Sequence, residues 1–410
     1  INADVDAVDP AALTNATVVT TQYNEVKDLT GAVAVFDATG TPVYYDDSLS
    51  SYWDVDPTMN RSHSITYVAT ERLNESTCGT DTCKMNVIQQ VNLTTGDTET
   101  VYTHRAEGGR WHDVDQLNDT RFLVADYGAD AVFIVDTETG IRPWTWTVES
   151  DVSKQNGGAY AGDWAHLNDV EYLPDGRIMV SLRNQDRVVF VDPTTGIEPE
   201  WTLGSEDDYE ILYEQHNPDY IPAARGGPAV LVADSENTRI VEYHRDADGA
   251  WNQTWQWRDN QLQWPRDADR LPNGHTLVTD SNGNRVVTVN QTGAVVQTIP
   301  IARPYEAERL GSGPESSRGK ARASSTSSAT SSDGDQTTAQ AGGFSLRGFL
   351  ESVVPTKIRN GIAYVLPVWA GFQHALAGTF AVGNICTWLV IEVYWSRYSV
   401  STYWPVKISK

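Results

Sequence analysis

Cysteine and positive charge are both scarce in this chain, and each shortage excludes a class of protein. The 410 residues include only 3 Cys, too few for a cysteine-rich metal module. Lys and Arg together number 30 against 55 Asp and Glu, which gives a net charge of −25. Because phosphate contacts need cationic patches, we do not expect a nucleic acid partner.

Such an excess of carboxylates over lysines is typical of extreme halophiles, and we expect a halophilic, archaeal-type surface protein. The alternative is an acidic secreted protein from another source. The chain also lacks a Gly-rich phosphate loop, which argues against a nucleotide donor. Neither a second cysteine pair nor a twelve-residue calcium loop is present, so we expect no metal and no cofactor.

The chain is rich in a repeated strand pattern. From His166 to Asp192 an apolar and polar alternation, a Pro-Asp-Gly turn and an aliphatic run describe three short antiparallel strands. The pattern returns at 112–136, 216–243 and 266–289, with a spacing of about 50 residues. A weaker copy begins at His63, and 16–47 forms the first blade, or a blade completed by a strand near 295–301. The sequence therefore predicts an all-β, six-bladed β-propeller over residues 1–310.

Aligning the copies places polar side chains in one column, just before the alternation of each first strand. The column holds His112, Asn168, His216 and Arg266, and His63 joins it from the weaker copy. First strands line the axial channel of a propeller, so these side chains are expected to converge there.

A second column carries Asp126, Asp234 and Asp280, where the copy at His166 has Leu182 followed by Arg183. His166 lies two residues before Asn168, so both side chains point the same way on a strand. Imidazole, amide and guanidinium groups in one concavity would make a pocket for an oxyanion such as sulfate. A neutral imidazole can also act as a nucleophile. We therefore assign catalysis to His112, His166, Asn168, Arg183 and His216, and substrate binding to His63 and Arg266.

Four short motifs resemble those of the arylsulfate sulfotransferases. They are His-Leu-Asn-Asp at 166–169, Ser-Leu-Arg at 181–183, Gln-His-Asn at 215–217 and Trp-His-Asp at 111–113. The resemblance covers about residues 20–305 and implies a six-bladed propeller that moves a sulfuryl group from an aryl sulfate ester to a phenolic acceptor. It implies no nucleotide or other cofactor, and a transient sulfohistidine at His216. The other four catalytic residues would hold the sulfuryl oxygens and assist the leaving phenolate. We do not expect residues 1–410 to include the separate N-terminal β domain of the periplasmic enzymes.

Two other functions stay open. One is a non-catalytic extracellular propeller that acts as a structural or ligand-binding protein of the cell envelope. The other is a metal-dependent lactonase or hydrolase, whose axial ligands would be Glu, Asn and Asp instead of the His and Arg found in the column.

Several features predict export. Cys78 and Cys83 are close enough in the chain to form a small disulfide. Ile1 is not a start methionine, so we expect that a leader has been removed. Glycosylation sequons open at seven asparagines, namely Asn15, Asn60, Asn74, Asn92, Asn118, Asn252 and Asn290.

The C-terminal quarter changes character. Residues 311–343 are rich in Ser, Thr and Gly and predict a flexible stalk, and 344–373 an interfacial or partly membrane-embedded segment. The apolar stretch 374–395 has the length of a transmembrane helix, and 396–410 would be a short cytoplasmic tail. We thus expect a propeller held outside the cell membrane, with polar groups in the helix available for a homo-oligomer or an envelope partner.

Overall fold

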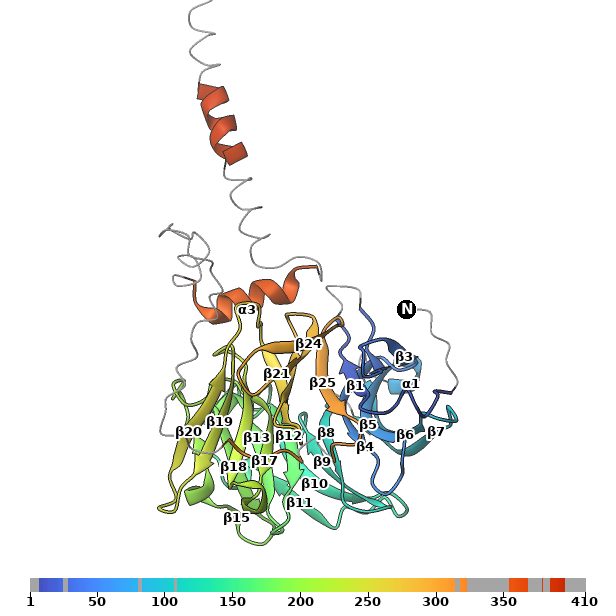
Figure 1. Ribbon diagram of the computed structural model, residues 1–410. Coiled ribbons are helices and arrows are strands. Elements are labelled where there is room, and N and C mark those ends of the chain that lie inside the picture. The colour runs from blue at the N-terminus through green and yellow to red at the C-terminus, as the bar shows by residue number, and fades with distance from the viewer. Residues whose placement is uncertain are drawn as a thin grey trace, which may run out of the picture. The chain divides into compact units, whose positions relative to one another are not determined.

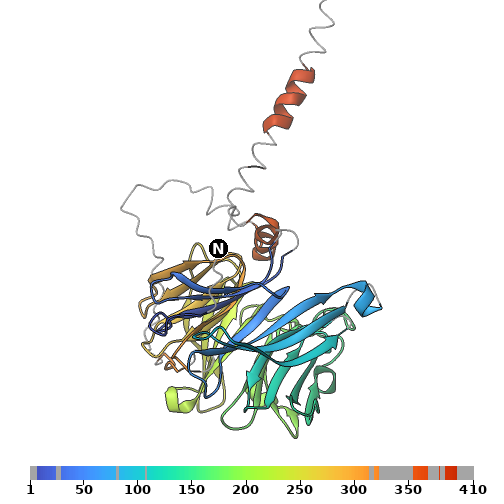
Figure 2. The same cartoon turned by 90° about the vertical axis from the view of Figure 1, so that its right-hand side faces the viewer.

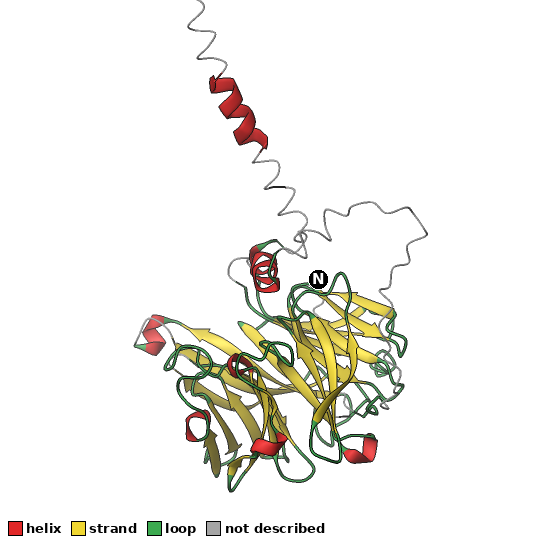
Figure 3. Ribbon diagram, turned by 90° about the vertical axis from the view of Figure 1, so that its left-hand side faces the viewer, coloured by secondary structure: helices red, strands yellow, loops and turns green. Residues whose placement is uncertain are grey.

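Six antiparallel sheets follow one another around a common axis in the computed structural model (Figure 1). The structure describes residues 7–24, 29–79, 83–106, 109–313, 318–322, 354–367, 378 and 384–394. The chain divides into two compact units, Ile1–Gln340 and Ala341–Lys410, which are treated separately below. The first unit is almost entirely strand and loop (Figure 3), which confirms the prediction of an all-β, six-bladed propeller.

Each blade is a meander whose strands are named here from the axis outward. The first blade is β25 (Pro304–Arg309), β1 (Thr17–Thr21), β2 (Ala32–Phe36) and β3 (Pro42–Asp46). The second is β4 (Ser51–Pro57), β5 (Ser64–Leu73), β6 (Cys83–Asn92) and β7 (Thr98–Ala106), with helix α1 (Glu75–Cys78) between β5 and β6. The third is β8 (Trp111–Gln116), β9 (Arg121–Asp126), β10 (Ala131–Asp136) and β11 (Trp144–Thr147).

The fourth blade is β12 (Leu167–Tyr172), β13 (Ile178–Leu182) and β14 (Arg187–Asp192), whose outer edge pairs with the short strands β15 (Gly196–Ile197) and β16 (Leu203–Gly204). The fifth is β17 (His216–Ile221), β18 (Ala229–Asp234), β19 (Arg239–Arg245) and β20 (Trp251–Trp257). The sixth is β21 (Pro265–Arg270), β22 (Thr276–Asp280), β23 (Arg285–Val289) and β24 (Val295–Pro300).

The ring closes within the first blade. The segment near 295–301, one of two alternatives for completing the first blade, forms β24, the outer strand of the sixth blade. Closure is made by β25, which pairs antiparallel with β1 as the innermost strand of that blade. The reason is visible in burial: β24 is largely exposed, whereas five of the six residues of β25 are buried.

The inner strands share a pattern that explains how the blades are joined. In most of them an acidic residue, an aliphatic residue and a second acidic residue follow one another, as in Asp54-Val55-Asp56 and Asp113-Val114-Asp115. An inner strand has an unpaired backbone edge toward the axis. The carboxylate of one blade accepts a hydrogen bond from the backbone of the next: the N–H of Val114 donates to Asp54 (3.1 Å) and the N–H of Ala307 to Asp267 (3.1 Å).

Apolar packing fills the spaces between blades. One cluster combines the third and fourth blades through side chains such as Leu123, Val132, Val170 and Val180, each at most 2% exposed. Five further clusters occupy other parts of the ring. Each blade therefore buries its faces only against its neighbours, as expected for a repeat architecture.

The predicted stalk begins on the propeller itself. Within 318–322, the N–H of Gly319 donates to the carbonyl oxygen of Arg270 (2.7 Å) and the N–H of Ala321 to that of Arg225 (3.0 Å). The N–H of Arg322 donates to Oε1 of Glu242 (2.8 Å). These contacts fix a segment that composition alone assigned to a flexible linker. Residues 314–317 and 323–343 of the predicted stalk lie outside the described residues.

The second unit contains helix α3 (Thr356–Val365) and a helical stretch at 384–394. Both fall in segments predicted to meet the membrane. Over the part of the chain that the structure describes, no helix combines the length and the apolar character that a membrane span requires. Much of the predicted span 374–395 and all of the tail 396–410 lie outside the described residues.

The axial carboxylates make a testable prediction about pH. Burial raises the pKa of Asp267 to about 7 from its ordinary 3.8. A group whose pKa is raised on folding binds more protons in the native state, so its stabilising effect is lost as pH rises through the native value. Between about pH 4 and about pH 7 the free energy of unfolding should fall by about 1.4 kcal/mol per pH unit for such a group.

The test compares urea unfolding of the wild type and Asp267→Asn at several pH values. Buried histidines make the free energy of unfolding rise with pH, which opposes the effect of Asp267. The informative quantity is therefore the difference in free energy of unfolding between wild type and Asp267→Asn at each pH. The variant should lose stability less steeply with rising pH. Asp192→Asn is the matched control, because Asp192 is close to the surface and its pKa is lowered by hydrogen bonds from the backbone of Thr194 and Thr195. Parallel pH curves for wild type and Asp267→Asn would contradict the prediction.

Candidate functional site

One ring of buried side chains lies at the start of the inner strands. In the third blade Trp111 pairs with Asp126 and Asp113 with Ala125, so His112 is an extra residue in a β-bulge. The inner strand of every blade has a similar register shift at or next to the equivalent position, and bulges of this kind redirect a side chain. In blade order, the residues of this ring are Tyr305, Trp53, His112, Asn168, His216 and Arg266, each at most 7% exposed.

His216 is held in one tautomer by its neighbours. Its Nδ1 lies 3.2 Å from the carbonyl oxygen of Glu214 and 2.8 Å from Oγ of Ser235. The hydroxyl of Ser235 donates to the carbonyl oxygen of Pro265 (2.7 Å), so toward His216 it acts as an acceptor. Both neighbours therefore accept, Nδ1 carries the proton, and Nε2 keeps its lone pair. Burial and the charges of Arg266 and Arg183 lower the pKa of His216 well below 6.5, which keeps the ring neutral.

His166 and Arg183 connect to His216 through Glu214. Nδ1 of His166 lies 2.6 Å from Oδ1 of Asp163 and 2.8 Å from a guanidinium nitrogen of Arg183. The carboxylate of Asp163 can only accept and the guanidinium of Arg183 can only donate, so these two contacts favour opposite tautomers of His166. Arg183 donates in turn to the carboxylate of Glu214. Burial and the charge of Arg183 lower the pKa of His166 to about 3.

His112 occupies an aromatic and cationic environment. Nε of Arg110 donates to its Nε2 (3.1 Å), so its proton is on Nδ1. Its ring stacks between Trp53 and Tyr127, with centroids 4.8 and 4.9 Å away, and lies 5.4 Å from the ring of His166. Burial and the charge of Arg110 lower the pKa of His112 well below its usual value.

Two other predicted residues, Asn168 and Arg266, contact neighbouring groups of the site. The side-chain amide of Asn168 donates to the carbonyl oxygen of Gln215 (2.9 Å), the residue before His216. The guanidinium of Arg266 lies over both Trp264 and Tyr305, 4.9 Å from each ring centroid. The structure thus brings His112, Asn168, His216 and Arg266 of the column together, and His166 and Arg183 lie beside them.

His63 is the exception. It lies in an exposed turn between β4 and β5, with a positive φ of 59°, and does not belong to an inner strand. The run after it, Ser64 to Val68, is part of the second strand of its blade, and the inner strand is Ser51–Pro57. The placement of His63 in the column is therefore corrected: the ring residue of that blade is Trp53.

Several residues of the site were not anticipated from the sequence. Arg110, Asp163 and Glu214 lie in the segments that lead into inner strands, where no repeat signal marks them. Tyr127 and Ser235 had a signal: each follows the last residue of a second strand, the position that Arg183 occupies in its own blade. Tyr305 also had one, because Pro-Tyr-Glu-Ala-Glu-Arg at 304–309 matches Pro-Arg-Asp-Ala-Asp-Arg at 265–270.

The described residues contain no group of three or more His, Cys, Asp and Glu side chains placed to hold a metal ion. The predicted disulfide is present, with Cys78 and Cys83 joined and their Cα atoms 5.5 Å apart. Five of the seven sequon asparagines are exposed, and Asn92 and Asn290 are half-buried. Asn74, Asn92, Asn118 and Asn290 also accept backbone hydrogen bonds in turns, which is a structural reason for an Asn-x-Ser/Thr pattern.

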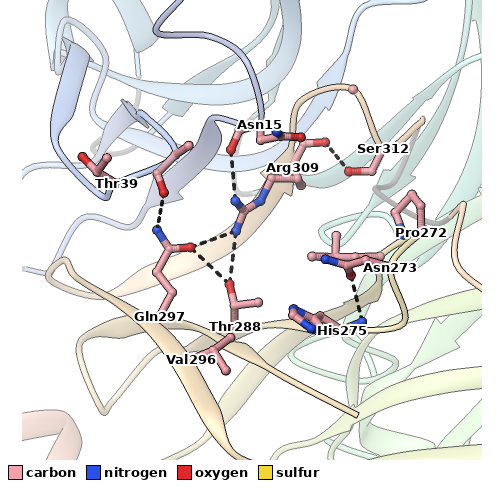
Figure 4. A pocket seen from close by; sticks show the side chains of 13 residues that line it. Asn15, Thr39, Pro272, Asn273, His275, Thr288, Val296, Gln297, Arg309 and Ser312 are labelled. Atoms are coloured by element: carbon pink, nitrogen blue, oxygen red, sulfur yellow. Dashed lines mark hydrogen bonds between the residues drawn. The ribbon is translucent and has the colours of Figure 1, made fainter.

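A separate cavity lies between the first and sixth blades, at the opposite end of the inner strands (Figure 4). Its volume is about 620 Å³. Arg309, the last residue of β25, points into it and donates to the carbonyl oxygen of Asn15 (3.0 Å) and to Oγ1 of Thr288 (3.1 Å). Tyr305 lies at the other end of the same strand, so this cavity is distinct from the histidine site.

The fold and the site define a class: a six-bladed propeller whose inner strands bring buried imidazoles and guanidinium groups together near the axis. The sequence profile described as Arylsulfotransferase (ASST) matches residues 5–222, more than half of the chain. The chain belongs to the arylsulfotransferase family. The match includes His112, His166, Asn168, Arg183 and His216, and it ends before Ser235 and Arg266. No protein of curated function matches the sequence.

Solved structures with a similar backbone fold are distant in sequence. One is a protein of unknown function from Bacteroides caccae, 12% identical with a TM-score of 0.49, covering 71% of this chain and 97% of that one. Another is the periplasmic gluconolactonase of Pseudomonas aeruginosa, 11% identical with a TM-score of 0.47, covering 72% and 99%. A third is virginiamycin B lyase from Staphylococcus aureus, 12% identical with a TM-score of 0.38, covering 62% and 78%. At these values the likeness carries no argument about function.

Proposed function

We propose that this protein transfers a sulfuryl group from an aryl sulfate ester to a phenolic acceptor through a sulfohistidine at His216. The observation that carries the proposal is the protonation of His216. Two acceptors, the Glu214 carbonyl and the Ser235 hydroxyl, hold the proton on Nδ1 and leave Nε2 as a lone pair. Membership of the arylsulfotransferase family supports sulfuryl transfer as the reaction class.

In the first half of the reaction, Nε2 of His216 attacks sulfur while the bond from sulfur to the aryl oxygen breaks. The electron pair of that bond leaves with the phenolate, which takes a proton from solvent. The ring then carries a positive charge, and its Nδ1–H still donates to Glu214 and Ser235. The guanidinium groups of Arg183 and Arg266 supply donors for the sulfuryl oxygens and offset the charge that develops on them.

In the second half, an acceptor phenol enters after the first phenol has left. It reacts as its phenolate, having released its proton to solvent. Its oxygen bonds to sulfur as the bond from Nε2 to sulfur breaks, which returns the neutral imidazole. The scheme requires no nucleotide or metal, and it predicts ping-pong kinetics.

We further propose that the propeller is held outside the cell membrane by the C-terminal region and that the protein comes from a halophile. The disulfide suits an oxidising exterior, and the apolar stretch 374–395 is the candidate anchor. Treating intact cells with a protease should release a soluble fragment that reacts with an antibody to the propeller. Protection of the propeller until the cells are lysed would contradict the external location.

The first catalytic prediction concerns His216→Ala. Removing the nucleophile should lower kcat/KM for release of 4-nitrophenol from 4-nitrophenyl sulfate by about a thousandfold or more, measured with phenol as acceptor. His63→Ala is the matched control, because His63 lies in an exposed turn outside the ring, and it should keep the wild-type rate. Peptide mass spectrometry of protein quenched without acceptor should find one sulfuryl group on the peptide that contains His216.

Activity retained in His216→Ala would overturn the assignment of the nucleophile. A wild-type protein with no transferase activity toward any aryl sulfate would favour the other candidate, a non-catalytic propeller of the cell envelope.

The second catalytic prediction concerns pH. The pKa of His216 is lowered from 6.5 by burial and neighbouring cations, so the nucleophile stays neutral as the medium becomes acidic. The rate of the first release of 4-nitrophenol, measured by rapid quench into alkali without acceptor, should therefore be constant between about pH 5.5 and about pH 8. A fall in this rate on acidification through pH 6.5, the ordinary histidine value, would contradict a buried neutral nucleophile. Steady-state turnover should instead rise with pH as the acceptor phenol ionises.

A further inference from the structure

His112 and His216 occupy equivalent positions of the ring, but their neighbours contact opposite nitrogens. Nδ1 of His216 lies within hydrogen-bond distance of the carbonyl oxygen of Glu214 and of the hydroxyl of Ser235. At His112 the contact is made with Nε2 instead, to which Nε of Arg110 donates at 3.1 Å. Both imidazoles therefore carry their proton on Nδ1, but His216 has a lone pair to offer at Nε2, whereas His112 has only its N–H.

The difference between the two histidines arises two residues before each of them. This position is Glu214 in the fifth blade and Arg110 in the third. Glu214 contacts its imidazole through a backbone carbonyl oxygen, which can only accept, and Arg110 through a guanidinium, which can only donate. The residue at this position thus decides which nitrogen of the imidazole remains available.

Two aromatic rings hold Arg110 and His112 in contact with each other. Trp53 comes from the second blade and Tyr127 from the third, and these blades pack side by side (Figure 2). The guanidinium of Arg110 lies over both rings, 4.7 and 5.0 Å from their centroids. The imidazole of His112 stacks on the same two rings, with interplanar angles of 28° and 20°. Cation–π contacts attract a guanidinium without using its N–H donors, so these rings orient Arg110 while its Nε donates to His112.

The N–H of His112 lies inside the site. His112 is 2% exposed, and its ring centroid is 5.4 Å from that of His166. Over the residues that the structure describes, Nδ1 of His112 has no hydrogen-bond partner. Buried N–H groups in folded proteins nearly always meet an acceptor, supplied by the protein or by a bound molecule. The oxygens of a sulfate ester can only accept, so they match this donor.

We propose that Arg110 is a positioning residue that fixes the proton of His112 on Nδ1, so that His112 donates a hydrogen bond to an oxygen of the bound sulfate ester and cannot act as a second nucleophile. The inference rests on the proposed sulfuryl transfer. While Arg110 donates to it, Nε2 of His112 neither accepts a proton nor attacks sulfur. His112 therefore keeps its proton throughout the transfer, and the attack is left to Nε2 of His216.

The position of the proton can be measured without any substrate. In protein labelled with isotopic nitrogen in histidine, NMR separates a protonated ring nitrogen from an unprotonated one, and His112→Phe identifies the signals of His112 by removing them. We expect the proton on Nδ1 in the wild type and a population with the proton on Nε2 in Arg110→Met. Arg121→Met is the matched control, because Arg121 is an exposed arginine at the opposite end of the same blade, and it should leave these signals unchanged. A wild-type proton on Nε2, or unchanged signals in Arg110→Met, would overturn the inference.

A double-mutant cycle tests whether Arg110 acts through His112. Arg110→Met should lower kcat/KM for 4-nitrophenyl sulfate by about tenfold, the effect of losing one hydrogen bond to a charged group. His112→Phe should lower it at least as much, and the double variant should be no slower than His112→Phe alone. Arg121→Met should keep the wild-type value, and cooperative urea unfolding of each variant shows that it is folded. Independent losses that multiply in the double variant would show that Arg110 does not act through His112, and would contradict the proposal.

Binding of an unreactive analogue separates this inference from the proposed function. In (4-nitrophenyl)methanesulfonate a methylene group replaces the bridging oxygen of the ester. If the wild type transfers no sulfuryl group, weaker binding by Arg110→Met and His112→Phe in calorimetry supports the donor without catalysis, and equal binding by all three proteins overturns it. If transfer occurs and the cycle holds, weaker binding assigns the hydrogen bond to a sulfuryl oxygen, and unchanged binding assigns it to the bridging oxygen.

Discussion

The hydrogen bond from the backbone of one inner strand to a carboxylate of the preceding blade is the interaction on which the rest of the propeller depends. Inner strands end their sheets at the axis, where their amides have no neighbouring strand. Asp54, Asp113 and Asp267 supply the missing acceptors to Val114, Val170 and Ala307. These hydrogen bonds join each blade to the next at a fixed position along the axis. The residue that precedes each of these acids is therefore also held at a fixed position along the axis. Ring closure and the position of the axial side chains, His112, Asn168, His216 and Arg266 among them, follow from the same contact.

Position on a bulged strand, and not proximity in sequence, brings the site together. His112, Asn168, His216 and Arg266 come from four blades and meet because each occupies the same place in its repeat. The groups that tune them come from loops and second strands. Glu214 contacts both Arg183 and His216, and Ser235 sets the proton of His216. Burial then keeps the imidazoles neutral, which is the state that sulfuryl transfer to nitrogen needs.

The repeat made six blades and most of the ring predictable from sequence, because a column of aligned residues converts directly into a ring in space. Apolar alternation places His63 in the column, but inner, second and outer strands all have this alternation, so it does not identify the inner strand. The inner strands differ by their acids, and by that criterion Trp53-Asp54-Val55-Asp56 and Tyr305-Glu306-Ala307-Glu308 stand out. Arg110, Asp163 and Glu214 had no comparable signal, since loops vary in length and only folding decides which side chain they present.

The docking of residues 318–322 fixes the point from which the chain leaves the propeller. Gly319 and Ala321 bond to Arg270 and Arg225, at the ends of the inner strands farthest from His112 and His216. The docked segment therefore makes its contacts at the end of the ring opposite the histidines, so the last described residues of the propeller unit take no part in the histidine site.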